Sequence, residues 1–155
     1  MSLDCNTPAA VAFIDAQRLV LARIAEKFGV RVIVTDDTSA AALDAVIEKN
    51  GVVAAVAEVK SRRMSFDDLE RFGTYLITAE KLEQMSRAAR LLCAEGFLFV
   101  HLRVDDVIVY WRVCDDVGNF CFQFERRKTE TQKTVNGGIV VRMNAYLPLS
   151  EARSL

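Results

Sequence analysis

Histidine is almost absent from this sequence of 155 residues, which contains one histidine, two prolines and one tryptophan. The four cysteines, Cys5, Cys93, Cys114 and Cys121, lie far apart and lack the paired spacing of zinc sites. The sequence therefore gives no support for a zinc centre. We expect the cysteines to be reduced thiols, as is usual in cytoplasmic proteins.

The sequence also lacks an apolar run long enough to cross a membrane, and its first residues show no signal-peptide pattern. Its net charge is −1, so no overall positive field indicates a nucleic-acid partner. Glycine-rich phosphate-binding loops and nucleophile-elbow motifs are missing as well. Hydrophobic residues make up 52% of the chain. We predict one domain spanning residues 1–155, located in the cytoplasm and not associated with a membrane.

The chain does contain an apolar hairpin that carries charged residues. The stretch 43–63 consists of two runs rich in valine, isoleucine and alanine, joined by an Asn-Gly pair. Strands of this composition are usually covered on both faces. Three charged residues interrupt the runs, namely Asp44, Glu58 and Lys60. Burying a carboxylate is costly unless the group is paired or binds a metal, so these acids indicate a functional site.

The turn of this hairpin decides whether the two acids meet. Glu58 and Lys60 are two residues apart on one strand and therefore point to the same face. A two-residue Asn-Gly turn with an unbroken ladder would send Glu58 to the face opposite Asp44. A three-residue loop, 49–51, with a bulge at its glycine pairs Asp44 with Val56 and makes the two acids diagonal neighbours. We predict the three-residue loop.

Two carboxylates without a nearby histidine favour Mg²⁺ or Mn²⁺ over zinc. Lys60 beside them could hold an attacking water or stabilise the charge that develops on a phosphoryl group. Asp36 also precedes Glu58 and is an alternative first acid. It lies in a turn-like segment outside the hairpin, so we prefer Asp44. The pattern is typical of metal-assisted phosphodiester hydrolysis.

This arrangement, D-x13-E-V-K across a hairpin with a helix before it and Ser-Arg and another helix after it, resembles the PD-(D/E)XK nuclease superfamily over roughly residues 19–103. Asp44 matches the first acid, Glu58 the second and Lys60 the lysine, while Leu43 replaces the proline of the motif. The resemblance implies the restriction-endonuclease-like α/β fold. That fold is an α-β-α sandwich around a mixed sheet with an αβββαβ core, here followed by additional C-terminal strands.

The resemblance also implies a Mg²⁺- or Mn²⁺-dependent DNA nuclease, for which we expect endonuclease action. Asp44 and Glu58 would bind the metal and Lys60 would position the attacking water. The backbone carbonyl of Val59 is implied as a further ligand, and Glu26 of the first helix is a candidate ligand. Small nucleases of this type often pair, so we expect a homodimer. The alternatives are a non-catalytic nucleic-acid-binding or assembly module, and an interaction domain with no nucleic-acid role.

Candidate DNA contacts lie around the hairpin. Arg62 and Arg63 follow its second strand and could clamp a phosphate through bidentate hydrogen bonds. Lys81 and Gln84 lie on a helix that we predict over 79–93, and the resembled superfamily often places a polar side chain of this helix near its site. The densest basic cluster, which could follow a DNA backbone, consists of Arg126, Arg127 and Lys128.

Apolar periodicity and turn residues predict the remaining elements. The single histidine, His101, shares a strand face with Phe97 and Phe99, and we predict a packed histidine there and not a catalytic one. We predict helices over 8–28, 65–72 and 79–93, and strands over 30–35, 74–77, 97–103, 107–113, 120–124 and 139–145.

Overall fold

The computed structural model describes residues 8–35, 43–132 and 137–155. None of the helices in these ranges is long and apolar enough to span a membrane. The helices are α1 (Pro8–Phe28), α2 (Phe66–Phe72) and α3 (Ala79–Leu92), with a 3₁₀ turn, η1, at Leu149–Glu151. The strands are β1 (Arg31–Val34), β2 (Ala45–Lys49), β3 (Val52–Arg62), β4 (Thr74–Thr78), β5 (Glu95–Leu102), β6 (Val107–Cys114), β7 (Glu125–Gln132), β8 (Ile139–Pro148) and β9 (Arg153–Ser154).

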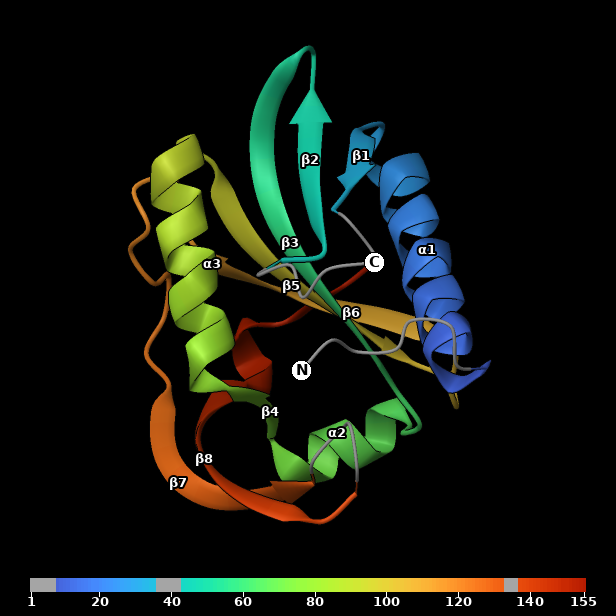
Figure 1. Cartoon of the computed structure of the whole chain (residues 1–155), viewed down its shortest axis with the longest axis vertical. Helices are drawn as coiled ribbons and strands as arrows, with labels where there is room; N and C mark the ends of the chain where they lie inside the picture. The colour runs from blue at the N-terminus through green and yellow to red at the C-terminus, as the bar shows by residue number, and fades with distance from the viewer. Residues whose placement is uncertain (1–7, 36–42, 133–136) are drawn as a thin grey trace.

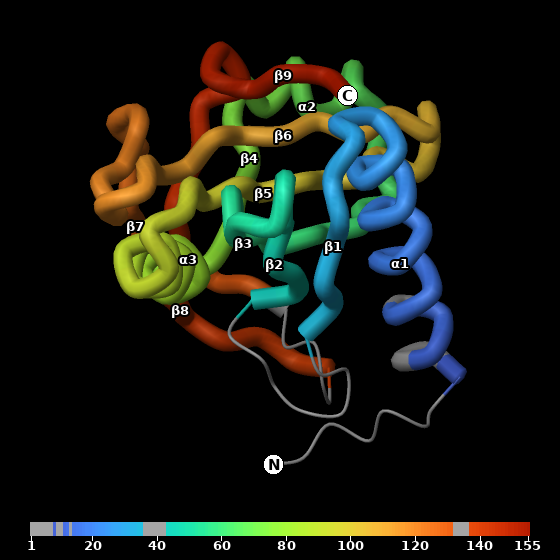
Figure 2. Tube along the Cα trace, turned by 90° about the horizontal axis from the view of Figure 1, so that it is seen from above, coloured from blue at the N-terminus to red at the C-terminus, as the bar shows by residue number. Residues whose placement is uncertain are grey.

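The strands form two sheets. The larger has six strands in the order β1-β2-β3-β5-β6-β9, and the smaller has three in the order β4-β8-β7. Only β3 and β5 pair in parallel within the larger sheet, and the chain between them forms α2, β4 and α3. Helix α1 covers one face of the large sheet and α3 covers the other (Figures 1 and 2). The predicted α-β-α sandwich with a mixed sheet and an αβββαβ core is therefore confirmed.

Alternate residues of the central strands build two separate apolar layers, because successive side chains of a strand point to opposite faces. Strand β3 contributes short side chains to the layer under α1, whereas the layer under α3 holds the fully buried Trp111. The Trp111 indole N–H donates to the Pro148 carbonyl oxygen at 2.8 Å and ties β6 to the end of β8. The α1 layer includes Val20, Leu21, Ile24, Ala55, Ala57 and Val59. The α3 layer includes Val56, Leu82, Met85, Leu98, Val100 and Trp111.

Local signals around α2 act as the sequence predicts. Ser65 is the N-cap: its side chain accepts from the Asp68 N–H, and the Asp68 side chain accepts from the Ser65 N–H in return. Gly73 ends the helix in the left-handed conformation, with φ of 68°. The two caps fix where α2 begins and ends, and β4 starts directly after Gly73.

The β2–β3 turn differs from the predicted three-residue loop, which is wrong. Asn50 and Gly51 have φ of 53° and 79°, and Lys49 pairs directly with Val52. Positive φ at both central residues makes a two-residue turn whose twist matches that of the flanking strands. The β2–β3 ladder is nevertheless interrupted two residues before the end of β2, because the pairing register shifts between Ile47 and Glu48. One extra residue of β3, residue 54, is accommodated there as a β-bulge.

The C-terminal third contains a second correction. The predicted strand over 120–124 is wrong, since this segment makes only an isolated bridge between Cys114 and Phe120. Its alternating aromatic residues pack edge to face, with the Phe120 and Phe124 ring centroids 5.1 Å apart. The alternation reflects packing against the core and not a hydrogen-bonded ladder. Strand β7 begins only at Glu125, where pairing with β8 starts.

Replacement of Gly51 by alanine tests the turn. No atom lies within 4 Å of the position of an added Cβ, so the cost is conformational and not steric. Because φ is 79° there, we expect Gly51→Ala to lower the free energy of unfolding by roughly 1–2 kcal/mol in urea titrations. Asn50→Gly keeps positive φ accessible and should leave it nearly unchanged. Equal stability of Gly51→Ala and the wild type would contradict the turn assignment.

Candidate active site

The bulge in β3 brings the two predicted acids to one face of the large sheet. Beyond it, Ala45 pairs with Ala57, and the Asp44 N–H donates to the Ala57 carbonyl oxygen at 3.1 Å. Asp44 lies just before the first pair of this ladder, and its carboxylate accepts from the Val59 N–H of β3, next to Glu58. The two acids are therefore neighbours across β2 and β3, whereas Val56, the predicted partner of Asp44, pairs with Val46.

Glu58 is a buried carboxylate between two ammonium groups. Its side chain is 1% exposed. The Lys60 Nζ lies 2.5 Å from the Glu58 Oε1, and the Lys81 Nζ lies 3.4 Å from the same oxygen. Burial raises the pKa of Glu58, and the charge of Asp44 raises it further, while Lys60 and Lys81 act in the opposite direction. The site thus keeps an acid in surroundings that disfavour its charged form.

Backbone contacts fix the position of Asp44 and of the strand beside it. The Val59 N–H donates to the Asp44 Oδ2 at 2.7 Å, and the Thr35 N–H donates to the Asp44 carbonyl oxygen at 3.0 Å. On the other side, the Gln17 Nε2 donates to the Val59 carbonyl oxygen at 3.4 Å. Through the bond to its N–H, Val59 links the Asp44 carboxylate to the strand that carries Glu58.

Gln17 of α1 contacts the Val59 carbonyl beside this site, and the sequence reasoning missed it. A signal was present, since Gln17 stands on the helix stripe that continues as Leu21, Ile24 and Phe28 and is otherwise apolar. The predicted ligand Glu26 is exposed in the last turn of α1. Nine residues separate it from Gln17, which corresponds to roughly 13 Å along a helix axis. The structure does not bring Glu26 to the acids.

The predicted DNA contacts divide into two groups. Arg62 is exposed and lies on the same strand face as Glu58 and Lys60, two residues further on. Arg63 is exposed beside Arg103, where both line a shallow hollow. Lys81 lies within the site, as described above. Gln84 is one turn further along α3, with its Nε2 3.5 Å from the Glu80 Oε1.

The basic cluster on β7 has mainly structural contacts. The Arg126 Nη2 lies 2.9 Å from the Glu83 Oε1 of α3, and its guanidinium stacks over the Phe124 ring at 4.7 Å. Arg127 lies 4.1 Å over the Tyr146 ring and pairs with Glu125. These contacts hold the small sheet together and join it to α3. Lys128 is exposed on the same strand.

Two further sequence expectations concern residues outside the acid pair. Asp36, the alternative first acid, lies outside the described residues. His101 is 7% exposed, and its Nε2 lies 2.7 Å from the Asp106 Oδ1. Asp106 also accepts from Arg23 of α1 at 2.8 Å. His101 is therefore a packed histidine on the α1 face of the sheet, as predicted, in a link between α1 and the β5–β6 turn.

The oxygen donors fit a hard divalent cation of the kind that the resemblance implies. Neither Glu58 oxygen makes a hydrogen bond of regular geometry within the described residues, although Lys60 is close to Oε1. A buried carboxylate with an unused oxygen requires a partner. The described ranges contain no cluster of three or more acidic, histidine or cysteine side chains that could hold a metal. Mg²⁺ is commonly bound by one or two carboxylates, with water and substrate completing its coordination, so Asp44, Glu58 and the Val59 carbonyl suffice.

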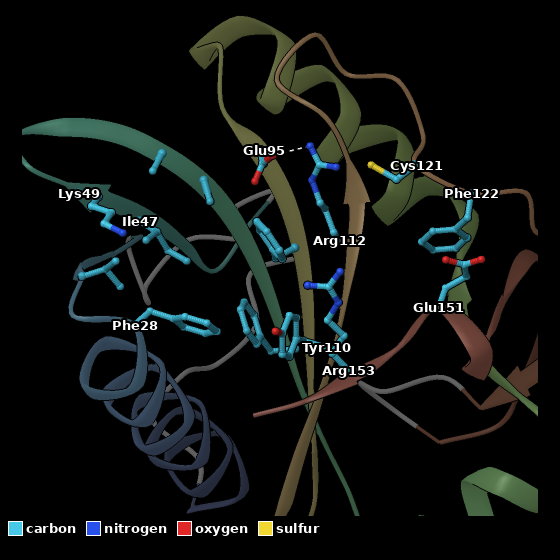
Figure 3. A pocket seen from close by; sticks show the side chains of 15 residues that line it. Phe28, Ile47, Lys49, Glu95, Tyr110, Arg112, Cys121, Phe122, Glu151 and Arg153 are labelled. Carbon is cyan, nitrogen blue, oxygen red and sulfur yellow. Dashed lines mark hydrogen bonds and ion pairs between the residues drawn. The ribbon is translucent and has the colours of Figure 1, made fainter.

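A cavity of about 570 Å³ lies on the other face of the sheet (Figure 3). Its aromatic wall is formed by Phe97, Phe99 and Tyr110, and Phe28 of α1 points toward it. The Phe99 and Tyr110 ring centroids are 5.5 Å apart. None of the acid-pair residues lines this cavity. The candidate active site is therefore the polar cluster under α3 and not this aromatic hollow.

The raised pKa of Glu58 predicts a stability cost for its charge. A protonated Glu58 favours the folded state, and this contribution is lost as the pH rises from 4.5, the ordinary value, through the raised pKa. In metal-free protein, Glu58→Gln should therefore gain stability relative to the wild type as the pH rises from 4 to 8. Urea unfolding in a metal chelator measures this difference, and Glu26→Gln is the exposed control. A difference that does not change with pH would contradict the burial of this charge.

Comparison with known proteins gives a structural likeness alone. No protein-family model matches the chain, and no curated protein matches its sequence. Among solved structures, the chain is similar to Hjc, a Holliday junction resolvase from the archaeal hyperthermophile Archaeoglobus fulgidus. The TM-score is 0.53 and the identity 19%, over 86% of this chain and 88% of that one. The likeness shows that this chain has the restriction-endonuclease-like fold of the resolvase.

Proposed function

We propose that this protein is a Mg²⁺- or Mn²⁺-dependent nuclease that hydrolyses phosphodiester bonds in DNA, with endonuclease action. The observation that carries the proposal is the buried Glu58 carboxylate, which neighbours Asp44 across β2 and β3 with two ammonium groups beside it. A structural role alone would not require two acids and two lysines within an apolar layer.

Each group of this cluster has a distinct task in the proposal. Asp44, Glu58 and the Val59 carbonyl would hold the cation, which when bound polarises a phosphoryl oxygen and acidifies a coordinated water. Lys60 orients the attacking water and stabilises charge that develops on the phosphoryl oxygens. Lys81, which contacts Glu58 from α3, and the exposed Arg62 would bind substrate phosphates.

The solved resolvase makes four-way DNA junctions a substrate to test, together with duplex and single-stranded DNA. Local cations have to attract this polyanion, since the net charge of the chain is −1. Arg62, Arg63 and Lys128 are the exposed candidates from the sequence: Arg62 ends β3, Arg63 follows it, and Lys128 lies on β7 of the small sheet. We also expect two copies to pair, because cutting both strands of a duplex needs two sites.

A second candidate function is a DNA-binding or assembly module that keeps the scaffold without cleaving. One observation favours it: Glu58 already faces two ammonium groups, which supply the compensating charge that a cation would otherwise provide. This alternative predicts that DNA is retained but not cut and that Mg²⁺ leaves the melting temperature unchanged. Thermal unfolding with and without Mg²⁺ separates the two functions.

Cleavage of labelled DNA tests the proposal directly. With Mg²⁺ or Mn²⁺, the wild type should nick or cut at least one of the three DNA forms, and a chelator should stop it. Lys60→Ala should lower the cleavage rate by about 100-fold or more, because it removes a group that stabilises developing charge. Lys49→Ala, on the distant end of the hairpin, is the matched control and should cut normally. Cleavage that survives Lys60→Ala, or proceeds without metal, would refute the mechanism.

Asp44→Asn tests the first acid separately. The amide keeps the side-chain oxygen that accepts from the Val59 N–H, so the fold should be retained. It loses the negative charge that a divalent cation requires, so cleavage should fall at limiting Mn²⁺ and recover in part at high Mn²⁺. Measuring the rate across a Mn²⁺ titration checks this. A Mn²⁺ dependence identical to that of the wild type would remove Asp44 from the site.

A further inference from the structure

Two arginines lie side by side where the parallel strands β3 and β5 end. Beyond the last pair of the ladder, the Arg103 N–H donates to the Arg62 carbonyl oxygen at 2.9 Å. The Val104 N–H donates to the Met64 carbonyl oxygen at 3.3 Å, so the two segments stay paired past the last residue of β3. Arg63 and Arg103 are both exposed, and together with Val104 they line a shallow hollow of about 480 Å³.

The acids nearest in sequence to this hollow are engaged elsewhere. The Asp105 Oδ2 accepts from the Phe66 N–H at the start of α2, and Asp106 pairs with groups of α1 and β5. Within residues 8–35, 43–132 and 137–155, Arg63 and Arg103 form no ion pair or side-chain hydrogen bond. Like charges on neighbouring strands repel, so this placement costs stability unless an anion compensates it. The hollow therefore holds positive charge that the described part of the chain does not neutralise.

The chemistry of the hollow favours a phosphate of a nucleic-acid backbone. The planar forks of two guanidinium groups form paired hydrogen bonds with phosphate oxygens. Apart from the two arginines, the hollow is lined by Val104, which adds no polar side chain that could recognise a base. Because the net charge of the chain is −1, a partner rich in phosphate has to be bound by local groups such as these.

The hollow lies further along the strand that carries the proposed catalytic residues. Arg63 is five residues beyond Glu58, and Lys60 and Arg62 lie between them. At about 3.3 Å per residue, this corresponds to roughly 16 Å along an extended chain. The phosphates of one strand of duplex DNA follow one another every ~3.4 Å along the helix axis. A phosphate in the hollow would therefore be about five nucleotides from one at the acid pair.

We propose that Arg63 and Arg103 form a clamp for one backbone phosphate of the DNA substrate, about five nucleotides from the bond that is cut. The inference rests on the proposed function, because it takes DNA as the substrate and the acid pair as the place of cleavage. The clamp binds the backbone without reading its sequence. It also sets how far the DNA must extend to one side of the cut.

The test compares Arg63→Gln, Arg103→Gln and the variant with both changes with Arg31→Gln. Arg31 is also exposed, but it lies on the edge strand β1 and pairs with Glu48. Binding of a labelled four-way junction and of duplex DNA is measured by fluorescence anisotropy in a chelator, over a range of salt concentrations. The variant with both changes should bind about 10-fold more weakly or worse, because it loses charge-assisted hydrogen bonds. Its dependence of log affinity on log salt should be shallower by about one.

The same variants separate binding from chemistry. At saturating DNA and Mn²⁺, the variant with both changes should cut at the wild-type rate, because the clamp does not touch the reacting phosphate. Arg31→Gln should match the wild type in affinity, salt dependence and rate.

A measurement on the wild-type chain locates the contact and does not depend on how well the variants fold. A methylphosphonate at one position of the junction removes the charge of one phosphate. With the cut mapped in Mn²⁺, we expect the wild type to bind more weakly when the modification lies about five nucleotides to one side of it. The variant with both changes should bind this junction and the unmodified one equally well.

Wild-type affinity in the variant with both changes, or an equal loss in Arg31→Gln, would overturn the inference and leave the nuclease proposal intact. A methylphosphonate effect that persists in the variant with both changes would do the same. Binding that depends on the two arginines, by a wild type that never cuts, would support the clamp and refute the nuclease. Absence of DNA binding by the wild type would overturn both.

Discussion

The buried carboxylate of Glu58 is the group on which the arrangement of the surrounding elements depends. An uncompensated charge in the apolar layer beneath α3 would be strongly destabilising. Lys60, on the same strand, and Lys81, from α3, provide the compensation at a single oxygen. The position of α3 is therefore coupled to the acid by an ion pair as well as by its apolar packing on β3.

The two faces of the large sheet have different roles. The α1 face is apolar and aromatic, and Gln17 of α1 contacts the Val59 carbonyl beside the acid pair. The α3 face combines a fully buried core with the Glu58 carboxylate and its two lysines. This division explains why the aromatic cavity and the acid pair are separate, since alternate residues of β3 and β5 supply one or the other.

The order of the elements was predictable because each depends on local chemistry. Ser65 and Gly73 delimit α2 through their own hydrogen bonds and backbone conformation, and a continuous run of valine and alanine identifies β3. The hairpin register was not predictable, because the bulge lies in a uniform Val-Val-Ala-Ala run where no residue marks it. The acids share a face because the shorter turn and the extra residue offset one another. The alternating phenylalanines of 120–124 led to a wrong strand prediction for a similar reason. Side chains that pack on a core and strands that pair in a sheet can both show a period of two residues.

For the site residues too, the sequence predicted what depends on local composition and missed what depends on contacts made by the fold. Asp44, Glu58 and Lys60 were identifiable because charge in an apolar strand is conspicuous, and the structure places them together. Arg126 and Arg127 were grouped as a basic cluster, yet their roles depend on Glu83 and Tyr146, which only the fold brings near.

The most direct test of the central claim is the anomalous scattering of Mn²⁺ in crystals of the wild-type protein. The account predicts a peak bound by carboxylate oxygens of Asp44 and Glu58 and by the Val59 carbonyl, with Lys60 turned toward a coordinated water. A structure at saturating Mn²⁺ in which the peak lies elsewhere, and Glu58 remains paired with Lys60 and Lys81, would contradict it.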